Sequence, residues 1–224
     1  MTESETFDYF MQKGLQLDLG PHAMSKLLAR YELSKLIMDL PGDIVDCGVY
    51  RGASLFQWAN FVELFAPRSQ KIVYGFDSFE GFSSEHDDAA DQASVSKLMD
   101  DDEKFVPRTV AELTSIAESL EVAHRLKFVA GDATETIPKF VEDHKGLRLC
   151  LLYLDFDVYD ATLAALNRLY PLIVPGGILV LDEYGSEGWG ESDAVDEFFR
   201  GKDVTFERFG WSAGPAAYCV KSRI

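Results

Sequence analysis

Short apolar runs recur along the chain from residue 44 onward and alternate with longer segments of mixed polarity. Each run is rich in β-branched or aromatic residues, which is typical of strands buried on both faces of a sheet. Repeated strand–helix–strand units predict right-handed crossovers and therefore a parallel sheet. The predicted strands are 44–50, 71–77, 126–132, 149–155 and 177–183, and the predicted helices are 53–66, 108–121, 133–143, 160–170 and 191–200.

The two ends of the chain show different patterns. Residues 27–40 are apolar at helical spacing and precede Pro41-Gly42, so 1–40 are expected to form an N-terminal helical segment that contacts substrate or another subunit. Runs 204–210 and 216–222 are joined by only five residues, which predicts an antiparallel hairpin. The remainder, 41–224, is predicted to be one α/β domain. It is expected to have a seven-stranded, mostly parallel Rossmann-like sheet with helices on both faces. This arrangement is the class I methyltransferase variant of the doubly wound fold.

Composition and charge exclude several classes of partner. The 224 residues are 47% hydrophobic, enough for a sizeable core, and the net charge of −17 disfavours binding to nucleic acid or an anionic membrane. No apolar run approaches the length of a membrane span, and the acidic N-terminus does not resemble a secretory signal. The three cysteines lie in separate apolar runs, as reduced core thiols would. We therefore expect a cytoplasmic protein.

A strongly acidic stretch interrupts the domain at 83–107. Between Glu85 and Glu103 there are eight acids and one base, Lys97. Such a stretch is either a solvated surface excursion or a mobile lid near the active site, since long insertions in compact domains often act as lids.

The loop after the first strand suggests the cofactor. In open α/β sheets, ligands bind beyond the carboxyl ends of the strands. Here Asp46 is followed by Gly48 and Gly52, a spacing that does not match the G-x-G-x-x-G of dinucleotide sites. A carboxylate at this turn is unfavourable for pyrophosphate but suits the cationic amine of S-adenosylmethionine. The alternative is an ordinary tight turn.

The next two strand ends agree with a nucleoside. Asp77, followed by Ser78, ends the second strand, where a carboxylate can accept hydrogen bonds from ribose hydroxyls. Asp132 and Ala133 follow the third strand, where adenine would lie, although Asp132 is equally suited to cap the following helix.

The fourth and fifth strands end in acids. Asp155 ends one strand, and Asp182 and Glu183 end the other; if the strands are neighbours, their carboxylates converge and need a cation between them. All-oxygen ligands favour Mg²⁺ or Mn²⁺, which would orient an acceptor hydroxyl and ease its deprotonation, giving Asp155 and Asp182 a catalytic role through the metal. Asp155 is also a candidate contact to the cofactor. Asp157 either joins the metal site or caps the next helix. The alternative for the whole cluster is that these acids are ordinary surface residues.

Four segments together resemble the macrocin O-methyltransferase (TylF-type) family of S-adenosylmethionine-dependent enzymes. They are DIVDCGVYRGAS, YGFDSFEGF, YLDFDVYDAT and LYPLIVPGGILVLDEY, and LARYEL and DEYGSEGWGES resemble the subgroup acting on nucleotide-linked deoxysugars such as dTDP-rhamnose. The resemblance implies a sugar or nucleotide-sugar acceptor and Mg²⁺ at Asp155, Asp182 and Glu183. It also implies cofactor contacts at Asp46, Gly48, Gly52, Asp77 and Asp132.

This sequence departs from the family at Glu183, where the family often has Asp. Val158 stands where catechol-type enzymes place a lysine, so no general base is assigned. A homo-oligomer is expected. The alternatives are a catechol or phenol O-methyltransferase, an NAD-dependent oxidoreductase, which the missing third glycine disfavours, and a non-catalytic cofactor-binding subunit.

Overall fold

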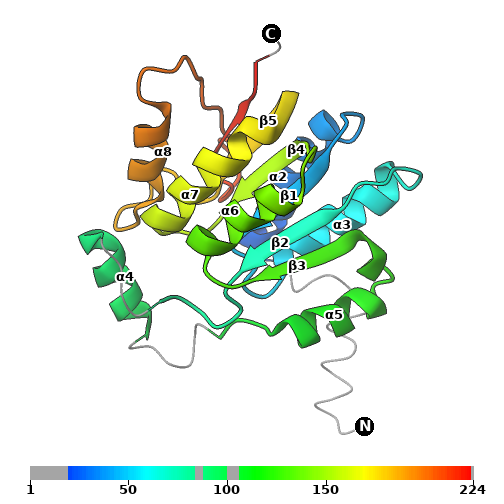
Figure 1. The fold of residues 1–224 in the computed structure, drawn as a ribbon, viewed down its shortest axis with the longest axis horizontal. Coiled ribbons are helices and arrows are strands. Elements are labelled where there is room, and N and C mark those ends of the chain that lie inside the picture. The colour runs from blue at the N-terminus through cyan, green and yellow to red at the C-terminus, as the bar shows by residue number, and fades with distance from the viewer. Residues whose placement is uncertain (1–19, 84–87, 100–105, 223–224) are drawn as a thin grey trace, which may run out of the picture.

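Five parallel strands form most of one sheet in the computed structural model, which describes residues 20–83, 88–99 and 106–222 (Figure 1). The strand order is β3-β2-β1-β4-β5-β6, and β6 runs antiparallel to β5. The predicted parallel sheet is therefore confirmed. The strands are β1 (Asp43–Cys47), β2 (Val73–Asp77), β3 (Leu126–Ala130), β4 (Leu149–Leu154), β5 (Ile173–Leu181) and β6 (Ala217–Val220).

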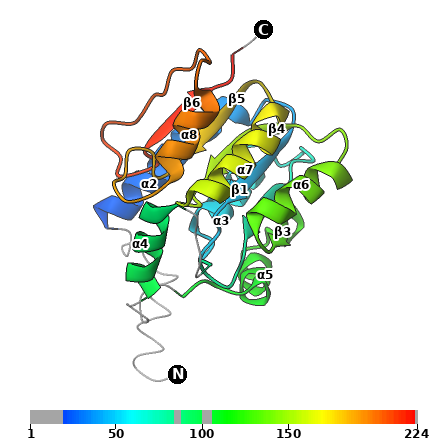
Figure 2. The same ribbon diagram turned by 60° about the vertical axis from the view of Figure 1, so that its left-hand side comes forward.

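Helices cover both faces of the sheet (Figure 2). Buried side chains of α2, α3 and α5 form one hydrophobic core with the sheet, and those of α6, α7 and α8 form the other. The helices are α2 (Pro21–Ile37), α3 (Ala53–Phe65), α4 (Ala89–Met99), α5 (Val110–Ser119), α6 (Ala133–Asp143), α7 (Tyr159–Leu169) and α8 (Glu191–Phe199), with 3₁₀ turns at Ala123–Arg125 and Tyr170–Leu172.

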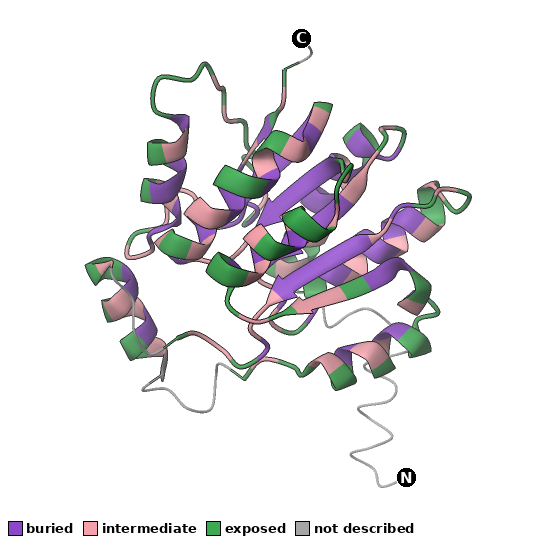
Figure 3. Cartoon of the chain, viewed as in Figure 1, coloured by how far each residue is buried: buried purple, intermediate pink, exposed green. Residues whose placement is uncertain are grey.

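The central strand β4 shows why the strand sequences are so apolar. All six of its residues are buried (Figure 3). Successive side chains of a strand point to opposite faces of the sheet. Leu151 and Tyr153 join the core beneath α2 and α3, whereas Leu152 and Leu154 join the core beneath α7 and α8. A strand covered by helices on both faces needs apolar residues at every position.

The sheet has six strands in the described part of the chain, and the prediction of seven was wrong. Residues 204–210 form no strand and pair through a single antiparallel bridge between Glu207 and Tyr218. Glu207 and Arg208 are exposed, so burial against a helix does not stabilise a longer strand pairing there. The antiparallel direction of the last strand was predicted correctly.

Two expected segments are described only in part. Helix α2 confirms helix in the predicted N-terminal segment from Pro21 onward, while 1–19 lie outside the described residues. The acidic stretch contains α4, which the sequence did not predict, and its residues 84–87 and 100–105 also lie outside the described part. Among the residues described, no helix has the length and apolar character of a membrane span.

Candidate active site

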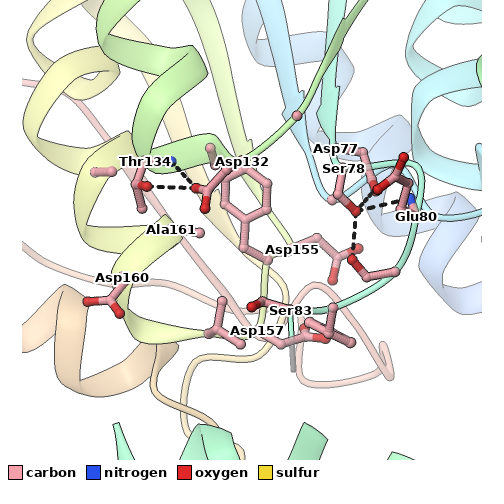
Figure 4. Close-up of a pocket in the computed structure, with 18 of the residues that line it drawn as sticks. Asp77, Ser78, Glu80, Ser83, Asp132, Thr134, Asp155, Asp157, Asp160 and Ala161 are labelled. Carbon is pink, nitrogen blue, oxygen red and sulfur yellow. Dashed lines mark hydrogen bonds between the residues drawn. The ribbon is translucent and has the colours of Figure 1, made fainter. Parts of the chain in front are cut away.

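A cavity of about 1170 Å³ opens at the carboxyl ends of the parallel strands (Figure 4). Figure 4 shows Asp77 and Ser78 on one side of it, Asp132 on the other, and Asp155 between them. Six of the predicted cofactor residues line this cavity, whereas Asp46 and Gly52, and the acids Asp182 and Glu183, are not part of its wall. The six are Gly48, Asp77, Ser78, Asp132, Ala133 and Asp155.

Gly48 is required by the close approach of two loops. Its φ is +85°, and a Cβ atom there would lie 1.9 Å from the carbonyl oxygen of Asp155. A residue with a side chain would therefore push apart the loops that follow β1 and β4.

Asp46 lies behind the cavity wall, fully buried, and neither carboxylate oxygen has a hydrogen-bond partner among the described residues. Burial raises its pKa to about 7, although the Ser54 hydroxyl, outside hydrogen-bond geometry, and Arg30 lower it. The predicted direct contact between Asp46 and a cofactor amine stays a prediction.

Asp77 ends β2 with its carboxylate already held by the chain. One oxygen accepts a hydrogen bond from the Phe79 amide at 2.7 Å, and the other accepts one from the Tyr50 amide at 2.9 Å. Ser78 donates to the carbonyl of Gly81 at 2.6 Å and so fixes the turn that follows. The carboxylate is thereby fixed at the cavity wall, where its remaining lone pairs are positioned for a ligand.

Asp132 caps α6. Its carboxylate accepts hydrogen bonds from the Thr134 amide and hydroxyl, both at 2.7 Å. The capping interpretation is therefore correct, and the residue also lines the cavity.

The structure brings three acids together beside the cavity. Ligand oxygens of Asp155, Asp157 and Glu183 lie within 4.8 Å of one another. Burial, with Asp182 and Asp157 nearby, raises the pKa of Asp155 well above its usual value; burial and the neighbouring Glu183 raise that of Asp157 to about 8. The close carboxylates disfavour one another's ionisation, and a cation among them would relieve this repulsion.

Asp182 is not in this group, although the sequence predicted it there. Its carboxylate is buried and faces α2, where Lys26 donates to it at 2.8 Å, Arg30 lies at 3.8 Å, and the Tyr153 hydroxyl donates a short hydrogen bond. Despite burial, Lys26 and Arg30 hold the pKa of Asp182 below its ordinary value. Lys26 and Arg30 lie far from Asp182 in sequence, so only the packing of α2 against β5 reveals the ion pairs.

Sequence reasoning also missed Asp91 of α4. It is buried, and its carboxylate accepts hydrogen bonds from the Tyr159 amide at 2.6 Å and the Gly190 amide at 2.7 Å. Those amides lie at the N-termini of α7 and α8, neither of which is capped by the side chain of its own N-cap residue. A Cβ atom at Gly190 would lie 2.6 Å from the Asp91 carboxylate. Nothing in the sequence distinguishes Asp91 from the other acids of its stretch.

The sequence profile of the family described as Macrocin-O-methyltransferase (TylF) matches residues 20–208. The chain belongs to this O-methyltransferase family. The family resemblance drawn from the sequence is thus confirmed.

Two curated relatives are O-methyltransferases by name, and the name of the second contains a rhamnosyl group. Mycinamicin III 3''-O-methyltransferase of Micromonospora griseorubida is 27% identical over 147 residues, which cover 65% of this chain and 56% of the relative. 8-demethyl-8-(2,3-dimethoxy-alpha-L-rhamnosyl)-tetracenomycin-C 4'-O-methyltransferase of Streptomyces olivaceus is 29% identical over 163 residues, which cover 71% and 58%. The chain spans less than two thirds of the length of these relatives.

Solved structures share the fold. Calicheamicin methyltransferase CalS11 superposes with a TM-score of 0.73 at 24% identity, covering 95% of this chain and 85% of that one. The O-methyltransferase NovP gives a TM-score of 0.72 at 22% identity, covering 86% and 79%. These matches confirm the class I methyltransferase fold.

Proposed function

We propose that this chain transfers a methyl group from S-adenosylmethionine to a hydroxyl of a sugar, with the help of a divalent metal ion. The observation that carries the proposal is the convergence of Asp155, Asp157 and Glu183 beside a cavity whose wall also contains Asp77. Family membership and the sugar-directed names of the relatives support the same reaction.

The donor would lie along the strand ends. Gly48 allows the backbone to approach it closely, Asp77 accepts hydrogen bonds from the ribose hydroxyls, and Asp132 and Ala133 border the adenine. Asp46, two residues before Gly48, is fully buried and is not part of the cavity wall. These roles place the sulfonium methyl group toward Asp155, where the acceptor must come.

The residues present fit a hard divalent cation. Asp155, Asp157 and Glu183 offer three oxygens at one place, and Asp182 would join them by exchanging Lys26 for the ion. When bound, Mg²⁺ or Mn²⁺ supplies positive charge that orients the acceptor hydroxyl and lowers its pKa.

The reaction itself is a direct displacement. The acceptor oxygen attacks the methyl carbon while the carbon–sulfur bond breaks, and its electron pair leaves on S-adenosylhomocysteine. Among the described residues of the cavity wall there is no histidine or lysine, so the hydroxyl proton passes to a carboxylate or to water. The chain's main contribution is to align donor and acceptor.

Calorimetry and turnover together test this function. S-adenosylhomocysteine should bind the purified protein and NADH should not, and labelled S-adenosylmethionine should transfer its methyl group to members of a glycoside panel. Chelation with EDTA should abolish turnover while leaving S-adenosylhomocysteine bound, and added Mg²⁺ should restore it. Tight NADH binding would overturn the donor assignment, and full activity of metal-free enzyme in EDTA would overturn the metal requirement.

A further inference from the structure

Glu191, the first residue of α8, is fully buried and hydrogen-bonded to the loop that carries Glu183. Its side-chain Oε1 accepts from the Glu183 amide at 3.0 Å. Its Oε2 is buried with no hydrogen-bond partner among the described residues. Burial of a carboxyl group with one oxygen unpaired lowers stability, so stability alone does not account for a glutamate at this position.

The backbone of Glu191 contacts the other loop of the proposed metal site. Its amide donates to the carbonyl oxygen of Asp157 at 3.0 Å. Asp157 follows β4, and Glu183 follows the neighbouring strand β5. One residue is therefore hydrogen-bonded to the backbone of two of the three clustered acids, to one through its side chain and to the other through its amide.

Asp157 has a backbone conformation that needs such support. Its φ is +66°, and the Val158 amide donates to the Phe156 carbonyl at 2.7 Å, so Asp157 is the central residue of a γ-turn. A residue with a side chain is strained in this conformation and keeps it only where its surroundings hold it. The hydrogen bond from the Glu191 amide is one of the contacts that hold this turn.

We propose that Glu191 is a positioning residue, which orients Asp157 and Glu183 toward a divalent cation. The inference rests on the proposed function and adds to it the residue that keeps two of the ligands in place. Residues that hydrogen-bond to metal-binding side chains or their loops fix the ligand geometry, and the loss of one typically weakens metal binding by about 10- to 100-fold.

The geometry separates this role from that of a direct ligand. The carboxylate oxygens that lie within 4.8 Å of one another belong to Asp155, Asp157 and Glu183, and Glu191 is not in that group. Burial and the neighbouring Asp157 raise the pKa of Glu191 well above its usual value. A neutral carboxyl group still accepts a hydrogen bond through its carbonyl oxygen, so the contact with the Glu183 amide does not depend on charge.

Mn²⁺ binding to the full-length protein, measured by electron paramagnetic resonance, tests the role of Glu191. Glu191→Leu is similar in size but has no acceptor, and it should bind Mn²⁺ about 10- to 100-fold more weakly than wild type. Glu191→Gln keeps an oxygen that can accept from the Glu183 amide, so it should recover most of the lost affinity. The control is Asp193→Asn, which removes a charge from an exposed position in the same turn of α8 and should bind Mn²⁺ as wild type does.

A fourth variant keeps the test decisive if Glu191→Leu does not fold. Glu191→Asp keeps the charge but is one methylene too short to reach the Glu183 amide, so it should bind Mn²⁺ more weakly than Glu191→Gln. Stronger binding by Glu191→Asp than by Glu191→Gln would overturn the inference, because the charge and not the hydrogen bond would then matter. Wild-type affinity in a folded Glu191→Leu would overturn it as well. Failure of the wild-type protein to bind Mn²⁺ would instead overturn the metal requirement of the proposed function.

Discussion

Asp77 is held ready at the cavity wall by two backbone amides, those of Tyr50 and Phe79. We expect Asp77→Ala to weaken S-adenosylhomocysteine binding by about 1.5–3 kcal/mol, because charged hydrogen bonds to the ribose are lost and the two amides are freed. Isothermal calorimetry measures this directly. Asp143→Ala, at the exposed end of α6, is the control and should leave affinity unchanged. Wild-type affinity in Asp77→Ala would mean that the ribose binds elsewhere.

Ionisation of Asp46 should change the free energy of unfolding as pH changes. Burial raises its pKa from 3.8 to about 7, so the folded chain binds the proton more tightly than the unfolded chain. Its contribution to stability is complete below the unfolded pKa and is lost as pH rises through about 7. Asn cannot ionise. Asp46→Asn should therefore become more stable than wild type with rising pH, by about 1–3 kcal/mol at pH 8.

Denaturant unfolding of the metal-free protein between pH 5 and 8 tests the Asp46 prediction. The exposed Asp39→Asn serves as the control and should follow wild type at every pH. A stability difference between Asp46→Asn and wild type that stays constant over this range would show that Asp46 does not titrate with a raised pKa.

At the scale of elements, α4 connects the acidic insertion to the loops that carry Asp157 and Glu183. Figures 1 and 2 show α4 at the edge of the molecule, near α7 and α8, and its Asp91 accepts hydrogen bonds from the N-termini of these two helices. Ser94 adds a hydrogen bond to the carbonyl of Gly188 at 2.5 Å. The described part of the insertion is therefore hydrogen-bonded to both loops of the proposed metal site.

Asp91→Ala should lower the free energy of unfolding by about 2–3 kcal/mol, because two amides lose a charged partner. It should also weaken Mn²⁺ binding, measured by electron paramagnetic resonance at a temperature where the variant is folded. The control is Asp88→Ala, which removes only the cap of α4 itself. Equal Mn²⁺ affinity in wild type and both variants would limit Asp91 to a structural role.

The hydrophobic pattern of the sequence did not predict α4, and it wrongly predicted a strand at 204–210. The parallel strands could be predicted because burial on both faces demands apolar residues at each position, as in β4. Helix α4 escaped prediction because its buried residues, among those described, are Asp91 and Val95, and one polar and one apolar position do not make a recognisable hydrophobic pattern. The extra strand was predicted because only five residues join 204–210 to 216–222, which leaves no room for a helix, yet most of 204–210 is exposed and pairs through one bridge.

At the scale of the whole molecule, the sequence predicted which residues lie near the candidate site, because the sheet topology fixes the positions of the strand ends. The strand ends place Gly48, Asp77, Asp132 and Asp155 at one cavity, because ligand sites in open α/β sheets lie beyond the carboxyl ends. The direction in which a carboxylate turns depends on partners distant in sequence. Asp182 follows β5 as predicted, but the cations of α2 draw its side chain away from Glu183.

This ion pair would make the N-terminal helix part of the proposed metal site. Lys26 is 25% exposed at its side chain and occupies one oxygen of Asp182, so an ion and the ammonium group compete for the same carboxylate. Lys26→Met removes the competing charge and keeps much of the apolar stem. We expect it to tighten Mn²⁺ binding by severalfold to about tenfold, which corresponds to about 1.4 kcal/mol at the upper end. Lys35→Met, on the exposed face of the same helix where Lys35 contacts Glu32 and the Tyr31 ring, should leave Mn²⁺ affinity unchanged. Unchanged affinity in Lys26→Met would mean that Asp182 remains bound to the helix, and that Asp155, Asp157 and Glu183 hold the ion without it.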